Sequence, residues 1–180
     1  FNQDISNWDV SNVKNMSEMF LGATSFNQDI SNWDVGSVEN MRYMFSGATS
    51  FNQNINNWDV SNVKSMDYMF SNVTSIGIVA FVGTLEYTRA DSTAFNQPVG
   101  NWNVSNVVNM SGMFSGSTSF NQDISNWDVS NVITMEAMFA ASEAFNQDIG
   151  SWDVGNVIDI SRMFNRATSF NQDISNWDVS

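Results

Sequence analysis

The chain has 180 residues, with 6 basic and 19 acidic side chains, a formal net charge of −13, and neither cysteine nor histidine. This composition excludes disulfides, thiolate and imidazole metal sites, cysteine nucleophiles and histidine general bases. The charge disfavours nucleic acid as a partner and favours divalent cations or basic proteins. No apolar run reaches the ~18 residues of a transmembrane segment.

One sequence, Phe-Asn-Gln-Asp-Ile-Ser-Asn-Trp-Asp-Val, recurs with small changes along the whole chain. Its copies open at Phe1, Phe26, Phe51, Phe95, Phe120, Phe145 and Phe170, and they are 25 residues apart except between the third and the fourth. A period of this length predicts a solenoid, in which neighbouring coils stack and share one core. Positions within each repeat are numbered here from its opening Phe.

We therefore expect a single repeat array over residues 1–180. Its coils are 1–25, 26–50, 51–75, 95–119, 120–144 and 145–169, followed by a partial coil at 170–180. The stretch 76–94 is either an inserted loop or a short, degenerate coil, and its apolar first half favours a buried element. Because the array starts and stops within repeats, we expect a segment of a longer protein, with any signal, anchor or capping unit outside it.

Each repeat carries apolar residues at eight positions, which in the first copy are Phe1, Ile5, Trp8, Val10, Val13, Met16, Met19 and Phe20. Alternation around Trp8-Asp9-Val10 predicts a short strand, and strands 25 residues apart can pair only in parallel. Val13, Met16 and Phe20 share one helical face, and position 15 carries an N-cap residue in each full copy. The expected fold is an α/β, leucine-rich-repeat-like, right-handed solenoid with one parallel β-sheet and short helices on the opposite side.

Two further expectations concern the packing of the coils. All 11 methionines lie at positions 16 and 19, a spacing that is typical of a buried face rather than of a thioether copper site. Asn2, Gln3 and Asn12 recur in nearly every copy, and we expect them to form amide ladders between coils.

The residues Phe-Asn-Gln-Asp-Ile-Ser-Asn-Trp-Asp-Val-Ser-Asn-Val-x-x-Met-x-x-Met-Phe resemble a known repeat of about 25 residues. It occurs in mycoplasma-type lipoproteins, bacterial surface proteins and marine protists, and is grouped beside the BspA-like leucine-rich repeats. The resemblance covers everything except Ile76–Ala94, and Val73–Phe81 is similar to a BspA-like core. It implies an extracellular or cell-surface location and a binding or adhesive role, and it supplies no catalytic residues.

The foremost candidate site is a row of carboxylates beside the repeated tryptophan: Asp9, Asp34, Asp59, Asp128, Asp153 and Asp178. On strands ~5 Å apart these charges would repel by about 0.8 kcal/mol per neighbouring pair. Either Ca²⁺ or a basic partner neutralises the row, or each Asp bonds nearby Asn or Ser donors and keeps the surface soluble. A second acidic row, Asp4, Asp29, Asp123, Asp148 and Asp173, is expected to stabilise Asx-turns.

Two other features qualify as candidate sites. Position 14 changes from Lys14, Glu39 and Lys64 to Val108, Ile133 and Ile158, and this later apolar stripe is either a partner surface or buried by a roll of the helix. Asn15, Asn72, Asn103 and Asn109 begin glycosylation sequons, and Asn72 is the best glycan candidate because Asn15 and Asn109 are needed as caps.

We expect a non-catalytic extracellular or cell-surface module that binds a protein or cell-surface ligand, or mediates adhesion, through its acidic strand face. No cofactor is expected apart from Ca²⁺ bound at this face. The alternative is a structural building block whose coils stack end to end into a fibre or surface layer, and a weaker third hypothesis is a threonine row that binds ice or mineral. We expect no enzyme, because equivalent repeated positions build no distinctive catalytic constellation.

Overall fold

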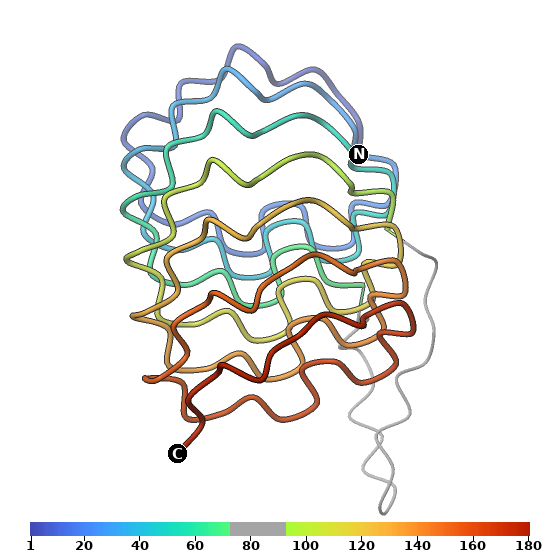
Figure 1. Ribbon diagram of the computed structural model, residues 1–180. Helices are drawn as coiled ribbons and strands as arrows, with labels where there is room; N and C mark the ends of the chain where they lie inside the picture. Colours follow the sequence, from blue (N-terminus) through green and yellow to red (C-terminus); the bar gives the residue numbers. More distant parts are fainter. Residues whose placement is uncertain (73–92) are drawn as a thin grey trace, which may run out of the picture.

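The computed structural model describes residues 1–72 and 93–180. The chain winds into coils that lie one above the next along a single axis, so that the first and last repeats form opposite ends of the stack (Figure 1). Consecutive coils are in register at the repeat length. Equivalent residues at position 15 are joined by isolated parallel bridges: Asn15 to Asn40, Asn40 to Ser65, Ser65 to Asn109, Asn109 to Thr134 and Thr134 to Asp159.

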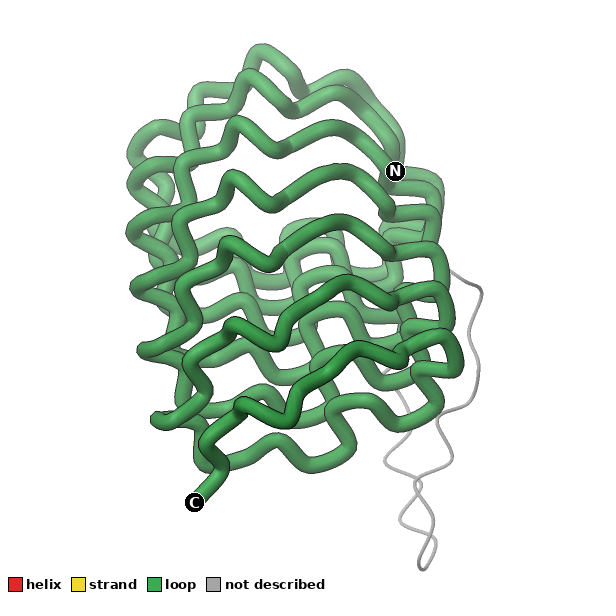
Figure 2. The backbone as a smooth tube through the Cα atoms, in the orientation of Figure 1, coloured by secondary structure: helices red, strands yellow, loops and turns green. Residues whose placement is uncertain are grey.

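Neither a helix nor an extended strand occurs in residues 1–72 and 93–180 (Figure 2). The predicted α/β solenoid, with a parallel β-sheet on one side and short helices on the other, is therefore wrong. The coils do stack in parallel, but turns and side chains take the place of both elements, for reasons that differ between the two sides of the coil.

Overlapping turns replace the expected helix. In the second coil the N–H of Met44 donates to the C=O of Met41, and that of Ser46 donates to Tyr43, each over 3.1 Å. Tyr43 and Gly47 have left-handed backbone, with φ of 54° and 69°. An α-helix needs φ near −60° at every residue, so a left-handed residue on every fourth position excludes it.

The resulting segment, positions 14–22 of each repeat, is called the ladder ribbon below. Its left-handed residues turn every second N–H toward the next coil. The N–H groups of Met41, Tyr43, Phe45 and Gly47 donate to the C=O groups of Ser65, Asp67, Met69 and Ser71 over 2.8–3.0 Å. Equivalent sets of four bonds join coils 1–25, 51–75, 95–119 and 120–144 to the coil that follows each of them.

These bonds explain why the ribbon displaces the helix. Four bonds contribute roughly 2–6 kcal/mol per coil boundary, whereas left-handed backbone costs about 1–2 kcal/mol at each residue other than glycine. Helical N–H groups would be used within their own coil. A helix is also about 10 Å across, and stacked rings place neighbouring coils only 4.8–6.5 Å apart.

On the opposite side, tryptophan side chains replace the expected sheet. Trp8 and Trp33 stack with ring centroids 6.4 Å apart, whereas paired strands lie about 4.8 Å apart. Backbone hydrogen bonds cannot cross that gap. Instead, the Trp33 indole N–H donates to the C=O of Ile5 in the preceding coil over 3.2 Å. Positions 1–13, held mainly by such side-chain links, are called the tryptophan face below.

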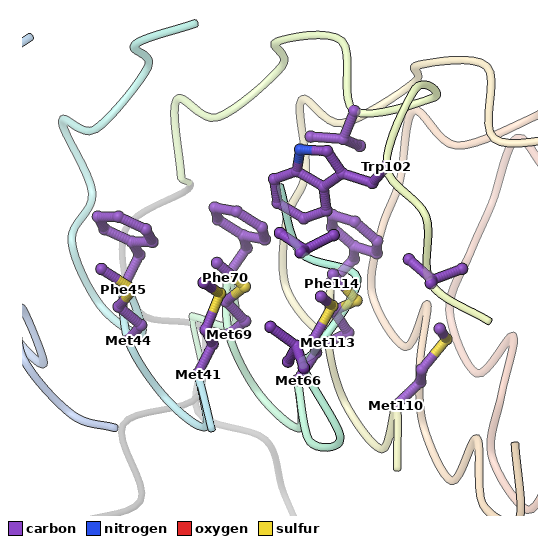
Figure 3. Packing of buried hydrophobic residues seen from close by; sticks show 14 of the residues in the cluster. Met41, Met44, Phe45, Met66, Met69, Phe70, Trp102, Met110, Met113 and Phe114 are labelled. Carbon is purple, nitrogen blue, oxygen red and sulfur yellow. The ribbon is translucent and has the colours of Figure 1, made fainter. Parts of the chain in front are cut away.

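All eight predicted apolar positions are buried in the interior coils. In the second coil these residues are Phe26, Ile30, Trp33, Val35, Val38, Met41, Met44 and Phe45. Phe45, Phe70 and Phe114 stack at centroid separations of 5.6 and 5.7 Å, with methionines packed beside them (Figure 3). The interpretation of the methionines as core residues is confirmed.

The expected amide ladders are also present. The Asn52 side-chain oxygen accepts from the Asn96 backbone N–H at 3.0 Å and from the Gln97 amide at 3.1 Å. At position 12, the Asn106 amide donates to the C=O of Ser61 over 2.8 Å. These side-chain bonds satisfy backbone groups that no sheet or helix pairs.

Coils 51–75 and 95–119 contact each other directly. The Met66 N–H donates to the C=O of Asn109 over 3.0 Å, and the rings of Phe51 and Phe95 stack at 6.0 Å. The predicted buried element within 76–94 lies almost entirely outside the described residues.

Candidate functional site

The row of carboxylates predicted beside the tryptophans is exposed along its whole length. It comprises Asp9, Asp34, Asp59, Asp128, Asp153 and Asp178. Each Asp follows the Trp of its coil directly in the sequence, and in the interior coils that Trp is buried. In those coils the core therefore fixes the backbone from which the carboxylate projects.

One oxygen of each carboxylate is used locally. The Asp128 Oδ1 accepts from the Ser130 backbone N–H at 3.1 Å and from its hydroxyl at 2.6 Å. Backbone N–H groups two residues on donate in the same way to Asp9, Asp34, Asp59, Asp153 and Asp178. The serine hydroxyl, and then the backbone N–H, hold the pKa of Asp9, Asp59, Asp128 and Asp178 below the usual value.

The curvature of the stack places this row on the wider side. Ring separations rise across the coil, from 4.8 Å for Tyr43 and Tyr68 on the ladder ribbon, through 5.6 Å for Phe45 and Phe70 in the core, to 6.4 Å for Trp8 and Trp33. The ladder ribbon is therefore the inner face and the tryptophan face is the outer, convex one. Leucine-rich repeats, by contrast, bring their strands together on the inner face.

This spacing weakens the case for a bound metal. At 6.4 Å, the Trp8 to Trp33 separation, two charges in water repel by only about 0.6 kcal/mol. The described residues contain no group of three or more acidic, His or Cys side chains placed to hold a metal ion. Ca²⁺ takes six to eight oxygen ligands, whereas each coil offers one carboxylate.

Asn103 interrupts the row in the fourth coil without changing its backbone. Its side-chain oxygen accepts from the Ser105 N–H at 3.2 Å and from the Ser105 hydroxyl at 2.7 Å. These are the bonds that Asp128 makes with Ser130. Asparagine therefore preserves the turn while removing the charge.

The second acidic row forms Asx-turns, as predicted. Asp123 accepts from the Ser125 N–H at 2.9 Å, and Asp4, Asp29, Asp148 and Asp173 make the equivalent bond. Asn54 occupies this position in the third coil and accepts from the Asn56 N–H at 3.0 Å. Here too, asparagine keeps the turn.

The predicted apolar stripe is exposed on the ladder ribbon. Val108, Ile133 and Ile158 have exposed fractions of 44%, 42% and 83%, so the structure does not bury them. In the first coils, Glu39 bridges Lys14 and Lys64 with N–O distances of 3.2 and 2.8 Å. These lysines, Lys64 first, lower the pKa of Glu39, but exposed pairs add little stability.

One interaction was missed in the sequence. Asp67 is buried, and its Oδ2 pairs with the Nε of Arg42 at 2.8 Å, while the Arg42 guanidinium lies 4.9 Å from the Tyr43 ring centre. Arg42 and Asp67 occupy position 17 of adjacent coils. Opposite charges one period apart could have revealed the pair.

The structure places the predicted glycan site, Asn72, among the buried residues. Asn72 is 5% exposed and its N–H donates to the C=O of Ser115 over 2.8 Å.

None of the described residues forms a helix long and apolar enough to cross a membrane. A protein-family model matches residues 1–78 and 84–180, and its description is Mycoplasma protein of unknown function, DUF285. No curated protein and no solved structure matches the chain. The resemblance to a mycoplasma-type repeat is confirmed, while its leucine-rich-repeat details are not. The chain therefore belongs to the DUF285 family of Mycoplasma proteins of unknown function.

Proposed function

We propose that this chain is a non-catalytic binding or adhesion module of an extracellular or cell surface, and that it holds a basic partner against its convex acidic face. The observation that carries the proposal is the row of six exposed carboxylates, of which Asp34, Asp59, Asp128 and Asp153 each follow a buried tryptophan directly. Membership of a family of Mycoplasma repeat proteins agrees with a surface role.

The geometry suits an extended ligand better than a compact one. Each carboxylate gives one oxygen to its own turn, as Asp128 does to Ser130, and leaves the other for a partner. A partner with several lysines or arginines along an extended segment would meet one carboxylate after another. Many weak contacts on a rigid support then add up through multivalency.

The experiment removes charge without disturbing any turn. Four substitutions on the tryptophan face, Asp34→Asn, Asp59→Asn, Asp128→Asn and Asp153→Asn, reproduce what Asn103 already shows to be compatible with the backbone. Binding of an oligolysine peptide is measured by calorimetry. We expect the affinity to fall by about tenfold or more, since four contacts of about 0.3–0.5 kcal/mol each are lost.

A matched control removes the same charge from the other acidic row. Asp4→Asn, Asp29→Asn, Asp123→Asn and Asp148→Asn follow the precedent of Asn54. We expect this variant to lose less than about threefold in affinity, because only the general attraction is reduced. Equal losses in the two variants would show that net charge, and not the proposed face, determines binding.

A further inference from the structure

Position 9 of the fourth coil is the one place where the acidic row also carries a modification motif. Asn103-Val104-Ser105 has the pattern Asn-x-Ser, whereas every other copy has Asp at position 9. Asparagine in this pattern accepts N-linked glycans when the middle residue is not proline. Because a chain rich in Asn and Ser contains several such motifs, the structure has to decide which of them is accessible.

The other three motifs have asparagines that are buried or that lie on the ladder ribbon. Asn72 is 5% exposed. Asn109 is joined by parallel bridges to the coils on both sides, and the hydroxyl of its motif, on Ser111, bonds to Thr134 of the next coil over 2.9 Å. Asn15 holds the same position in the first coil. Position 15 therefore belongs to the inner face, where neighbouring coils lie closest.

Asn103 differs from these residues in both exposure and hydrogen bonding. Its side chain is exposed on the convex tryptophan face. Its Oδ1 accepts from the Ser105 N–H at 3.2 Å and from the Ser105 hydroxyl at 2.7 Å. These bonds hold the oxygen over its own turn, and the Nδ2 donates to no residue in the ranges 1–72 and 93–180. The nitrogen that would carry the sugar is therefore free in the folded chain.

The core holds this acceptor in place and leaves room in front of it. Trp102 and Val104, on either side of Asn103, are 3% and 1% exposed. Trp102 and Trp127 stack at 6.5 Å, against 4.8 Å between tyrosines on the ladder ribbon. Side chains on the convex face therefore diverge as they leave the surface. A glycan on Asn103 would extend into solvent without displacing a neighbouring coil.

We infer that Asn103 is the N-glycan acceptor of this chain. In the transfer, the Asn103 Nδ2 attacks C1 of an oligosaccharide that is carried on a lipid diphosphate. The C1–N bond forms, the C1–O bond to the diphosphate breaks, and the nitrogen loses one proton. The inference rests on the proposed extracellular location, because the motif is modified in secreted proteins.

The glycan would divide the acidic row into two parts. Asp59 occupies position 9 in the coil before Asn103, and Asp128 occupies it in the coil after. A bulky sugar between them would stop one extended basic segment from contacting both carboxylates. Weak contacts add up only when they are made simultaneously. We therefore expect the glycosylated chain to bind an oligolysine peptide less tightly than the bare chain.

The acceptor is tested in the full chain, secreted from a eukaryotic host behind a cleavable signal. Glycans are released with an amidase, which leaves aspartate in place of each modified asparagine, and peptide mass spectrometry then measures the occupancy of each motif. We expect most copies of Asn103 to be modified, and Asn72 and Asn109 to be bare. A bare Asn103, or equal occupancy at Asn72 or Asn109, overturns the assignment.

Two substitutions in the same row provide matched controls. Asp128→Asn creates the motif Asn-Val-Ser in the next coil, where the Ser130 hydroxyl already bonds to this side chain at 2.6 Å, so we expect a second glycan there. Asp34→Asn makes the same charge change, but Gly36 stands where the serine is needed, so we expect no second glycan. If Asp128→Asn gains no glycan while Asn103 carries one, the convex geometry does not select the acceptor.

Calorimetry with an oligolysine peptide tests the division of the row. The glycosylated chain should bind about threefold or more weakly than the same chain made in bacterial cytoplasm without a glycan. Equal affinities would overturn the division and leave the acceptor assignment intact. The bare chain also separates this inference from the proposed function. If it binds no oligolysine while the secreted chain is modified at Asn103, only the binding function falls. If it binds while Asn103 of the secreted chain stays bare, only the acceptor assignment falls.

Discussion

The ladder ribbon and the tryptophan face join the same coils by different means. On the ribbon, backbone donates to backbone at each step, as from Tyr43 to Asp67 over 2.9 Å. On the tryptophan face, side chains make the links, as from the Trp58 indole to the C=O of Ile30 over 3.2 Å. A link through the backbone accepts almost any side chain, whereas a link through a side chain requires that residue.

This difference explains the pattern of variation between the copies. The ladder ribbon varies widely: position 18 is Glu18, Tyr43, Tyr68, Gly112, Ala137 or Arg162. The linking positions of the tryptophan face hardly vary: position 8 is always Trp, and positions 2 and 3 are always Asn and Gln. The sequence is constrained where side chains join the coils, and it is freer where the backbone does.

The largest expected effect comes from removing one tryptophan link. Trp127→Ala should destabilise the fold by about 3–5 kcal/mol, because it leaves a cavity and leaves the C=O of Val99 without its indole donor. That bond is 3.0 Å long. Urea denaturation measures the change. In the same assay Trp8→Ala should cost less than about 1 kcal/mol, because Trp8 is half exposed. Similar costs at both sites would contradict the side-chain link.

A missing link can be restored in the second coil. Asn62 donates its side-chain amide to the C=O of Gly36 over 2.7 Å, but Ser37 occupies the same position one coil earlier and is too short to reach Ser11. Ser37→Asn should stabilise the fold by about 0.5–1.5 kcal/mol through a new bond to the C=O of Ser11. The reverse change, Asn131→Ser, should cost a similar amount in the same denaturation assay, because it removes a bond of 2.8 Å.

The sign of the stability change caused by a glycine substitution distinguishes the ladder ribbon from a helix. Ala141 has left-handed backbone, φ 56°, where other coils have Gly47 or Gly116. Ala141→Gly should stabilise the fold by about 0.5–1 kcal/mol, because it relieves strain. In a helix the same change would destabilise by about 1 kcal/mol. Ala140→Gly, at a buried neighbour without positive φ, is the control and should destabilise.

The smallest expected effect is on acid stability. Hydrogen bonds from Ser130 lower the pKa of Asp128 in the folded state. Asp128 therefore stabilises the fold above its unfolded pKa, about 3.9, and this stabilisation is lost as the pH falls through the folded pKa. Asp128→Asn should therefore reduce the fall in melting temperature between about pH 5 and about pH 3. Ser130→Ala should act in the same direction. A steeper acid dependence in either variant would contradict the assigned bonds.

The sequence was informative where a residue acts through its own side chain. The eight buried positions, the amide ladders and the Asx-turns were all predicted correctly, because hydrophobicity and amide or carboxylate chemistry belong to the residue itself. The strand and the helix were wrong for one shared reason. Both predictions relied on local periodicity, and Val13, Met16 and Phe20 have a spacing that a helix and the ladder ribbon satisfy equally well.

The spacing between coils decided the rest, and it is a property of the stack. On the tryptophan face, stacked rings hold neighbouring coils 6.4 Å apart, which is too far for a sheet. On the other side, neighbouring ladder ribbons lie too close together for helices, and the N–H groups of each ribbon point toward the next coil. The sequence by itself determined which side chains enter the core and that the coils repeat in register. Only the tertiary structure decided which backbone conformation joins them and that the acidic row lies on the convex side, because both depend on distances between residues in different coils.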